Sequence, residues 1–216
     1  MYFDYSKVVE SGTYDKIRGL VNFVFKRMYK ITYVGTENIP ESGPLIIACN
    51  HQHALDPFII SNSCPRVVHY MAKKELYKNP VAAKMLVKLN SFPIERGIGD
   101  MQAVNYACQI VKDGKAFGIF PEGTRQHSFT PQKRGKSGVA WILRETDADL
   151  LPVSIYTDEQ FKRGTKLTVR YGKVIKNEEF VFTKPHSVKE LHQASEKVMA
   201  EITKLWEEGH AEDNAR

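Results

Sequence analysis

Few cysteines occur in this sequence, and none of them lies close to another. Cys49, Cys64 and Cys108 are an odd number without close pairs. Such a pattern argues against a disulfide framework and is typical of proteins from a reducing compartment. Cys49 stands beside a polar cluster, which raises the possibility of a catalytic thiol. Its apolar neighbours, residues 46–48, instead predict a buried structural cysteine.

Long hydrophobic runs are also missing. No stretch of 18 uncharged apolar residues occurs, so we expect no transmembrane helix. Residues 1–16 are polar and do not predict a secretory signal peptide. No Gly/Ser-rich or Pro-rich linker and no internal repeat divides the chain. Its 216 residues are enough for one domain with a substantial core.

The net charge of +6 shows a shortage of acidic residues. A basic surface suits nucleic acid, anionic lipid or a phosphorylated small molecule, although a solvated basic surface is the simpler alternative. No RNA-binding signature or zinc-finger spacing is found, so no nucleic-acid partner is expected. Basic residues crowd the N-terminal segment: Lys16, Arg18, Lys26, Arg27 and Lys30.

An apolar helix flanked by cations is predicted within residues 14–33. This pattern fits a helix that lies in the interface of a bilayer, with its apolar face in the lipid. An amphipathic helix packed on its own domain is the alternative. The apolar residues of the segment are Ile17, Leu20, Val21, Phe23, Val24, Phe25 and Met28.

Strand-like and helix-like segments alternate along the rest of the chain, which predicts a single α/β domain with a mostly parallel sheet flanked by helices. Strands are expected at 31–34, 44–50, 67–71, 92–94, 116–120, 150–156 and 166–172. Helices are expected from Asp56, at 79–89, 101–112 and 138–144, and after a capping box at 187–190. Sites in such sheets lie at the carboxyl ends of strands. Residues 51–56 and 122–125 both directly follow apolar strands.

The stretch 50-NHQHALDPF-58 combines two histidines with an aspartate, and three interpretations compete. The group His51, His53 and Asp56 could bind a metal, hold a proton-transfer pair, or form a polar turn without chemistry. A catalytic zinc site would need further ligands, and the later histidines show no ligand spacing. Asn50 is predicted to hold the turn through local hydrogen bonds, and Pro57 to start a helix.

Patterns for other catalytic classes fail. The segment 135-GKSG-138 is one residue short of a serine-hydrolase elbow, and no P-loop glycine stands at position 130. The spacing of His51 and Asp56 allows the carboxylate to orient the imidazole as a base. No protein nucleophile is evident, so we expect a hydroxyl of the substrate to attack an acyl carbonyl directly.

Further polar loops indicate an anionic group on the substrate. Arg96, Arg125 and Lys73 suit phosphate recognition, although each alone could be an ordinary surface cation. The pair 123–124 would bring backbone N–H groups close to a phosphate. Glu122 is expected either to act as an orienting acceptor or to pair with an arginine.

These motifs together resemble the glycerolipid acyltransferases of the 1-acylglycerol-3-phosphate acyltransferase type. NHQHALD resembles their N-H-x4-D block, FPIER the second block, FPEGTR the third and LLPVSI the fourth. The segment 72-AKKEL-76 and Lys136-x-Gly138 also match. The series covers about residues 35 to 175. An H-x4-D motif alone is weak, but five blocks in order are specific.

The resemblance implies transfer of a fatty acyl group from acyl-CoA or acyl-carrier protein to the sn-2 hydroxyl of 1-acylglycerol-3-phosphate, giving phosphatidic acid in phospholipid biosynthesis. His51 would be the general base and Asp56 its orienting partner, and Pro152 would be structural. No metal and no bound cofactor beyond the acyl donor is expected. The implied phosphate-binding set is Arg96, Arg125, Lys73, Glu122, Gly123 and Thr124.

Two departures concern the acceptor. His53 and Gln126 stand where the family often has serine, so another lysophospholipid or glycerol 3-phosphate remains an alternative acceptor. Outside this class stand a metal-dependent hydrolase and a non-catalytic lipid-binding protein. The resemblance divides the chain into a membrane-surface helix at 1–34 and an acyltransferase domain at 35–216. It also predicts a peripheral protein on the cytoplasmic face of the cell membrane, bound through residues 14–33.

Overall fold

A seven-stranded sheet forms the centre of the protein in a computed structural model. The structure describes residues 3–6, 8, 10–97, 99–126, 128, 130–183 and 187–211. The strands lie in the order β1-β7-β6-β2-β5-β3-β4, and only the β6–β7 pair is antiparallel. The predicted single α/β domain with a mostly parallel sheet is confirmed.

The elements follow the alternation expected from the sequence. The strands are β1 (Lys30–Val34), β2 (Leu45–Cys49), β3 (Val68–Lys73), β4 (Ser91–Ile94), β5 (Ala116–Ile119), β6 (Asp149–Tyr156) and β7 (Lys166–Tyr171). The α-helices are α1 (Tyr14–Met28), α2 (Asp56–Ser63), α3 (Pro80–Lys88), α4 (Met101–Lys112), α5 (Gly138–Thr146) and α6 (Val188–Glu207). Short 3-10 helices are η1 (Thr36–Asn38), η2 (Lys74–Lys78) and η3 (Asn177–Glu179).

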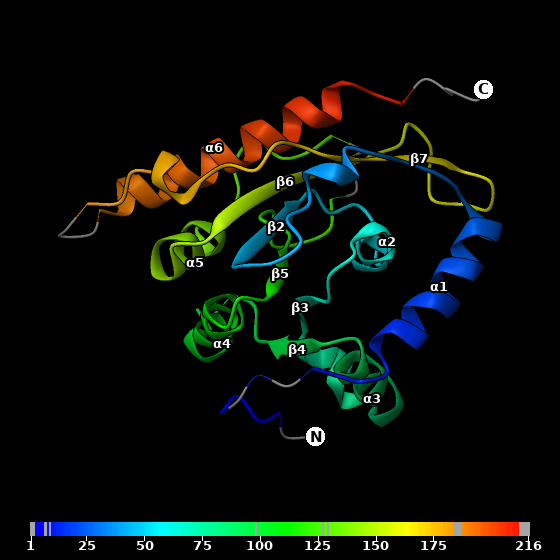
Figure 1. The fold of residues 1–216 in the computed structure, drawn as a ribbon, viewed down its shortest axis with the longest axis horizontal. Helices are drawn as coiled ribbons and strands as arrows, with labels where there is room; N and C mark the ends of the chain where they lie inside the picture. The colour runs from blue at the N-terminus through cyan, green and yellow to red at the C-terminus, as the bar shows by residue number, and fades with distance from the viewer. Residues whose placement is uncertain are drawn as a thin grey trace.

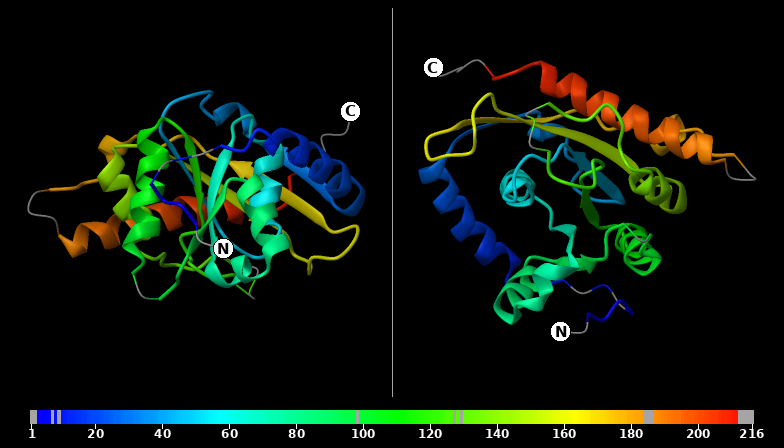
Figure 2. Two further views of the ribbon diagram at one scale, coloured as in Figure 1. Left: turned by 90° about the horizontal axis from the view of Figure 1, so that it is seen from below. Right: turned by 180° about the vertical axis from the view of Figure 1, so that it is seen from behind.

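Helices cover both faces of the sheet. α1, α2 and α3 lie on one face, whereas α4, α5 and α6 lie on the other, as Figures 1 and 2 show. Each face has its own core, with Phe25 and Ile59 under the first layer and Ile110 and Val198 under the second. This arrangement leaves loops and sites to the two sides of the sheet where strands begin or end. The side where β2, β3 and β5 end is called the carboxyl edge below.

The strand β1 runs against the direction of β2. It pairs in parallel with β7, and β7 is antiparallel to β6, which in turn is parallel to β2. The end of α1 therefore lies at the edge where β2, β3 and β5 end, and the Met28 carbonyl accepts a hydrogen bond from Gly164 there at 2.7 Å. The N-terminal helix is thereby joined to the carboxyl edge of the sheet.

The predicted N-terminal helix is shorter than residues 14–33, because α1 ends at Met28 and the chain enters β1 two residues later. Its apolar residues divide between two surfaces. Tyr14 and Phe25 are buried against the domain, whereas Leu20, Phe23 and Val24 are exposed. The division of the chain at residue 34 stays a prediction. Among the described residues, no helix is long and apolar enough to cross a membrane.

The start of α6 was expected to carry a capping box. The Ser187 hydroxyl does accept a hydrogen bond from the Lys189 N–H at 3.1 Å. The Glu190 carboxylate, however, accepts from the Thr183 N–H at 3.1 Å. The glutamate therefore holds Thr183, four residues before the serine.

Candidate functional site: the carboxyl edge of the sheet

The loop after β2 brings His51 and Asp56 together. The distance from His51 Nδ1 to Asp56 Oδ2 is 2.8 Å, and both residues are buried. A carboxylate only accepts hydrogen bonds, so this contact fixes the proton on Nδ1. The other imidazole nitrogen, Nε2, is then the basic one. The structure thus produces the pair that the five-residue spacing predicted.

Asp56 begins the helix α2 without capping it. It is the first residue of α2, after Leu55, and its carboxylate points back into the loop. Oδ2 accepts from the N–H groups of Gln52 at 2.7 Å and His53 at 2.8 Å, in addition to the contact with His51. The upstream donors therefore hold the carboxylate, and Pro57 follows in the first turn as predicted.

Glu122 connects the loop after β5 to the loop after β2. It is 1% exposed. One carboxylate oxygen accepts from the His51 N–H at 2.7 Å, and the other accepts from the Gln132 N–H at 2.8 Å. Burial raises the pKa of Glu122, and these two donors act in the opposite direction. Of its two predicted roles, this geometry matches the orienting acceptor.

Asn50 holds the site to the sheet. Its amide donates to the Ile155 carbonyl at 3.0 Å and accepts from the Ile155 N–H at 2.8 Å. The expectation that Asn50 bonds within its own turn is wrong, because the neighbouring strand β6 offers both backbone partners. The start of the loop after β2 is therefore fixed against β6.

Aromatic rings set the plane of the His51 imidazole. The ring stacks on Phe120, with centroids 4.1 Å apart and planes inclined by 20°, and Phe120 stacks on Tyr70 at 6.1 Å. Tyr70 fits because residue 118 is glycine: a Cβ there would lie 2.2 Å from the Tyr70 ring. The imidazole is thereby held between a carboxylate at its edge and an aromatic face.

The second histidine of the cluster lies in a different contact. The His53 ring stacks on Phe161, with centroids 4.4 Å apart. Its Nδ1 accepts from the Leu55 N–H at 3.3 Å. Burial lowers the pKa of His53, and the charges of Arg125 and His51 lower it further against the opposing effect of Asp56. His53 therefore favours its neutral form and lies within electrostatic reach of the pair.

The three predicted phosphate-binding cations lie at the same edge. They form fewer hydrogen bonds within the chain than His51 and Asp56 do. Arg96 follows β4 and Arg125 follows β5, and both are exposed. Burial, followed by the positive charge of Arg125, lowers the pKa of Arg96. Within the described residues, neither guanidinium has a hydrogen-bond or ion-pair partner. Lys73 ends β3, and its Nζ lies 3.5 Å from Glu75 Oε1.

The glycine of the third block shapes its turn. Gly123 has a φ of +74°, a region that favours glycine. Its N–H donates to the Phe120 carbonyl at 3.0 Å, so that group is already used inside the turn. A Cβ at this position would lie 3.1 Å from the Lys136 side chain. Thr124 is exposed beside it.

The remaining reactive groups of the cluster have structural surroundings. Cys49 is fully buried, and burial, followed by the charges of Asp56 and Glu122, raises its pKa. A neutral buried thiol is a weak nucleophile. In the part of the chain that the structure describes, no three His, Cys, Asp or Glu side chains are grouped as a metal would need.

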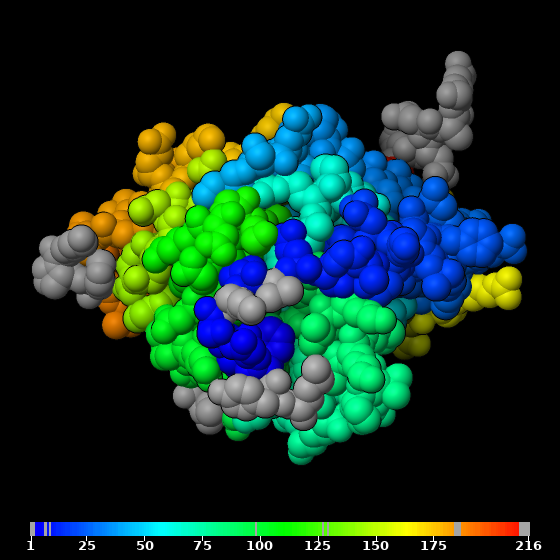
Figure 3. All heavy atoms as spheres, turned by 60° about the horizontal axis from the view of Figure 1, so that its bottom comes forward, coloured from blue at the N-terminus to red at the C-terminus, as the bar shows by residue number. Residues whose placement is uncertain are grey.

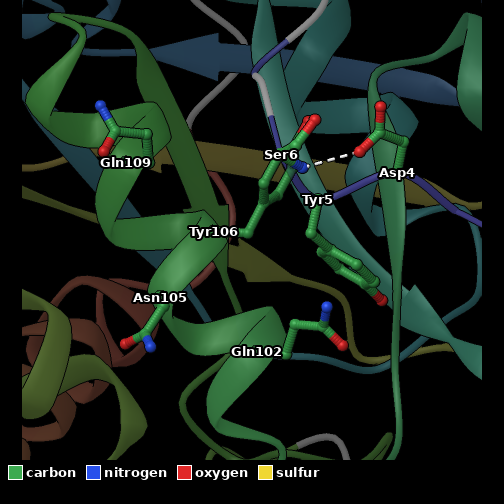
Figure 4. Close-up of a pocket in the computed structure, with 7 residues that line it drawn as sticks. All are labelled: Asp4, Tyr5, Ser6, Gln102, Asn105, Tyr106 and Gln109. Atoms are coloured by element: carbon green, nitrogen blue, oxygen red, sulfur yellow. Dashed lines mark hydrogen bonds between the residues drawn. The ribbon is translucent and has the colours of Figure 1, made fainter.

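A cavity of about 490 Å³ lies elsewhere, between the N-terminal segment and α4. Figure 4 shows the short segment carrying Asp4, Tyr5 and Ser6 facing polar side chains of the helix. Tyr5 is fixed there by a hydrogen bond to the Pro93 carbonyl at 2.8 Å. None of the residues predicted for the site lines this cavity.

The sequence and the fold of this chain are similar to those of known acyltransferases. Residues 30–156 match the model of the family described as Acyltransferase. The chain belongs to the acyltransferase family. A 1-acyl-sn-glycerol-3-phosphate acyltransferase of Bacillus subtilis (strain 168) is 32% identical over 149 residues, which are 67% of this chain and 73% of the relative. One from Borreliella burgdorferi is 34% identical over 136 residues, 61% of this chain and 53% of that protein.

A solved structure shares the fold. The 1-acyl-sn-glycerophosphate (LPA) acyltransferase PlsC from Thermotoga maritima has a TM-score of 0.68 and 23% identity, covering 94% of this chain and 80% of its own. The family match contains every residue predicted for the site.

Sequence reasoning missed two aromatic residues that stack on the histidines of the candidate site. Phe120 stood in the quoted third block, at the end of an apolar strand, and that position was its only signal. Phe161 lies in the loop after β6, where no motif marks it.

Proposed function

We propose that this acyltransferase moves a fatty acyl group from acyl-CoA or acyl-carrier protein to the sn-2 hydroxyl of 1-acylglycerol-3-phosphate. The product would be phosphatidic acid, an intermediate of phospholipid biosynthesis. The observation that carries the proposal is the buried contact of 2.8 Å between His51 Nδ1 and Asp56 Oδ2. It supplies a base in a chain whose relatives from Bacillus subtilis and Borreliella burgdorferi are named 1-acyl-sn-glycerol-3-phosphate acyltransferases.

In the proposed mechanism, His51 Nε2 takes the proton of the acceptor hydroxyl as that oxygen attacks the thioester carbonyl carbon. The new C–O bond gives a tetrahedral oxyanion. Its collapse breaks the C–S bond, and the leaving thiolate takes the proton from the imidazolium. Asp56 holds the imidazole in the required tautomer and stabilises its charged form. No metal and no further cofactor takes part.

The cations at the same edge would bind the phosphate of the acceptor. Arg96 and Arg125 lack internal partners among the described residues, so both forks are available for a phosphate. Two neighbouring positive charges repel each other until an anion lies between them. Lys73 adds a further charge. A different lysophospholipid or glycerol 3-phosphate would carry the same phosphate and is the alternative acceptor.

The substrates are amphiphiles, so the proposal includes a membrane. The exposed Leu20, Phe23 and Val24 of α1, with Lys16 and Arg27 on the same stripe of the helix, would lie on the lipid. The protein would then be peripheral, on the cytoplasmic face of the cell membrane. The exposed stripe supports this part of the proposal, because a helix packed only on its own domain does not need it.

Acyl transfer from oleoyl-CoA to lysophosphatidic acid in mixed micelles tests the function, with His51→Ala as the key variant. We expect a fall in turnover of about 10²- to 10⁴-fold, the usual contribution of a general base. His192→Ala, which removes an exposed histidine of α6, is the matched control. Activity that survives EDTA disfavours the metal-dependent hydrolase. Full activity in His51→Ala would remove the base from its role and direct attention to His53.

A further inference from the structure

The segment η2–α3 presents apolar side chains to solvent beside the site. Leu76 is 50% exposed, Val81 76% and Met85 51%. Tyr77 and Ala83 are buried and fix the segment on the domain. Val81 and Met85 are four residues apart, so they stand one above the other on the outer side of α3. The segment therefore has an inner face that packs and an outer face that is apolar and open.

Cations flank this outer face. Lys84 and Lys88 are exposed and, at roughly 100° per residue, lie on the stripe adjoining Val81 and Met85. Nearby Lys74 pairs with Glu95. In contrast, neither Lys84 nor Lys88 forms an ion pair with any residue that the structure describes. A partner that covers the outer face should therefore offer both apolar material and negative charge.

The position of the segment places it at the rim of the site. η2 begins where β3 ends, and the first turn of α3 follows it, so Leu76 and Val81 lie at the carboxyl edge of the sheet. Lys73 directly precedes η2, and the contact of Lys74 with Glu95 joins it to the residue before Arg96. The start of the outer face thus borders the cations assigned to the substrate phosphate, and α3 runs from there towards the opposite edge, where the parallel strand β4 begins.

The exposed part of α1 also lies near the carboxyl edge, but beside strand β1 rather than beside β4. α1 ends there because β1 starts at the carboxyl edge. Its Phe25 ring packs on that of Phe58 in the first turn of α2, with centroids 6.4 Å apart. Strands β1 and β4 are the two ends of the strand order. α1 and α3 nevertheless cover the same face of the sheet, and Figure 3 shows both on one face of the molecule.

We propose that the outer face of η2–α3, formed by Leu76, Val81, Met85, Lys84 and Lys88, is a second contact with an anionic membrane surface. This inference rests on the proposed function in the choice of lipid as occupant. The exposed stripe of α1 and the outer face of η2–α3 are both apolar and cationic, and they lie near opposite end strands of the sheet. A flat, extended partner can reach both. Apolar side chains enter the acyl region, and lysine ammonium groups remain among anionic headgroups. With both contacts made, the carboxyl edge faces the lipid.

Vesicle binding by the full chain tests this contact without depending on turnover. Sedimentation with equimolar phosphatidylglycerol and phosphatidylcholine vesicles compares wild type with Val81→Ser/Met85→Ser. We expect binding to weaken by about 10-fold, because two partly inserted side chains are lost. Val181→Ser/Val188→Ser is the matched control, since these valines are 68% and 70% exposed but belong to the α6 side of the sheet. Its binding should equal that of wild type.

The charge component has its own variant. Lys84→Gln/Lys88→Gln should weaken binding to the mixed vesicles by about 10-fold at low salt. On pure phosphatidylcholine vesicles it should bind as wild type does. Adding Leu20→Ser/Phe23→Ser in α1 to the Val81/Met85 variant should multiply the two losses, because the contacts are separate. Circular dichroism and thermal unfolding confirm that each variant is folded.

Several outcomes would overturn the inference. Unchanged vesicle binding by Val81→Ser/Met85→Ser would do so, and so would an equal loss in the valine control. If that variant instead loses binding to an acidic acyl-carrier protein, the face is a protein-docking site. If it dissociates a dimer in analytical ultracentrifugation, the face joins two copies of the chain. Wild type that lacks acyl transfer but shows the expected binding pattern would contradict only the proposed function.

Discussion

The loop after β2 and the cations at the ends of β3, β4 and β5 share one edge of the sheet but hold their side chains differently. His51 and Asp56 are buried and joined to each other, and their loop is tied to Glu122. Arg96 and Arg125 are exposed and repel each other electrostatically. The proposed base is thus already held by its own chain, whereas the proposed phosphate-binding cations would gain their partner from the substrate. Preorganisation of this kind lowers the cost of reaching the transition state.

Breaking the buried half should have the largest effect. Asp56→Ala removes the oxygen that accepts from His51 Nδ1 and from the N–H groups of Gln52 and His53, so nothing fixes the tautomer of His51 or stabilises its imidazolium. We expect turnover to fall by about 10³- to 10⁴-fold, the order seen for carboxylates that orient a catalytic imidazole. Initial rates with oleoyl-CoA and lysophosphatidic acid measure it. A loss below tenfold would show that the carboxylate does not orient the base.

Removing one charge from the exposed half should have a smaller and different effect. Arg125→Ala and Arg96→Ala should each lower kcat/KM by about 10- to 100-fold, mostly through KM for the acceptor, because a charged hydrogen bond to phosphate is lost. Arg134→Ala is the control, since Arg134 pairs with Glu196 at 3.2 Å on α6. Steady-state kinetics with varied acceptor distinguish these cases. Unchanged KM in both variants would place the phosphate elsewhere.

The smallest effect concerns His53, which lies between the two halves. Its pKa in the folded protein is lowered below the ordinary value of about 6.5, so the folded state binds fewer protons there than the unfolded state. The associated stability is present above pH 6.5 and is lost as the pH falls through the lowered pKa. His53→Phe keeps an aromatic ring against Phe161 but cannot titrate.

Denaturant unfolding at pH 7.5 and at pH 5.5 measures this difference. The free energy of unfolding should fall on acidification by more in wild type than in His53→Phe. The variant retains His69, whose pKa is also lowered by burial, so that contribution is common to both proteins. Equal falls in the two proteins would show that the titration of His53 is not coupled to folding.

The parts of this site that the sequence predicted are those fixed by local contacts. The pair of His51 and Asp56 needs only a five-residue turn, and Pro57 lies in the first turn of the helix that it was predicted to start. The missed parts depend on packing between distant segments. Nothing local in Asn50 indicates its bonds to Ile155, and nothing near Phe161 indicates its stack on His53.

The N-terminal helix shows the same limit. Its sequence predicted one apolar face, and the structure has two, because α2 takes one set of side chains and leaves another exposed. A periodicity count cannot separate residues that pack on a neighbouring helix from those that do not. The reversed direction of β1 places the end of α1 at the carboxyl edge of the sheet. It likewise depends on the pairing with β7.

Gly118 carries a consequence for attempts to stabilise this enzyme. Replacing glycine by alanine inside a regular strand usually raises thermal stability, since it restricts the unfolded chain. Here the added methyl group would displace Tyr70, which stacks on Phe120, which in turn stacks on His51. A screen for heat-resistant variants would therefore meet a trade-off at a residue that touches no substrate, and protein engineering of the sheet should leave position 118 unfilled.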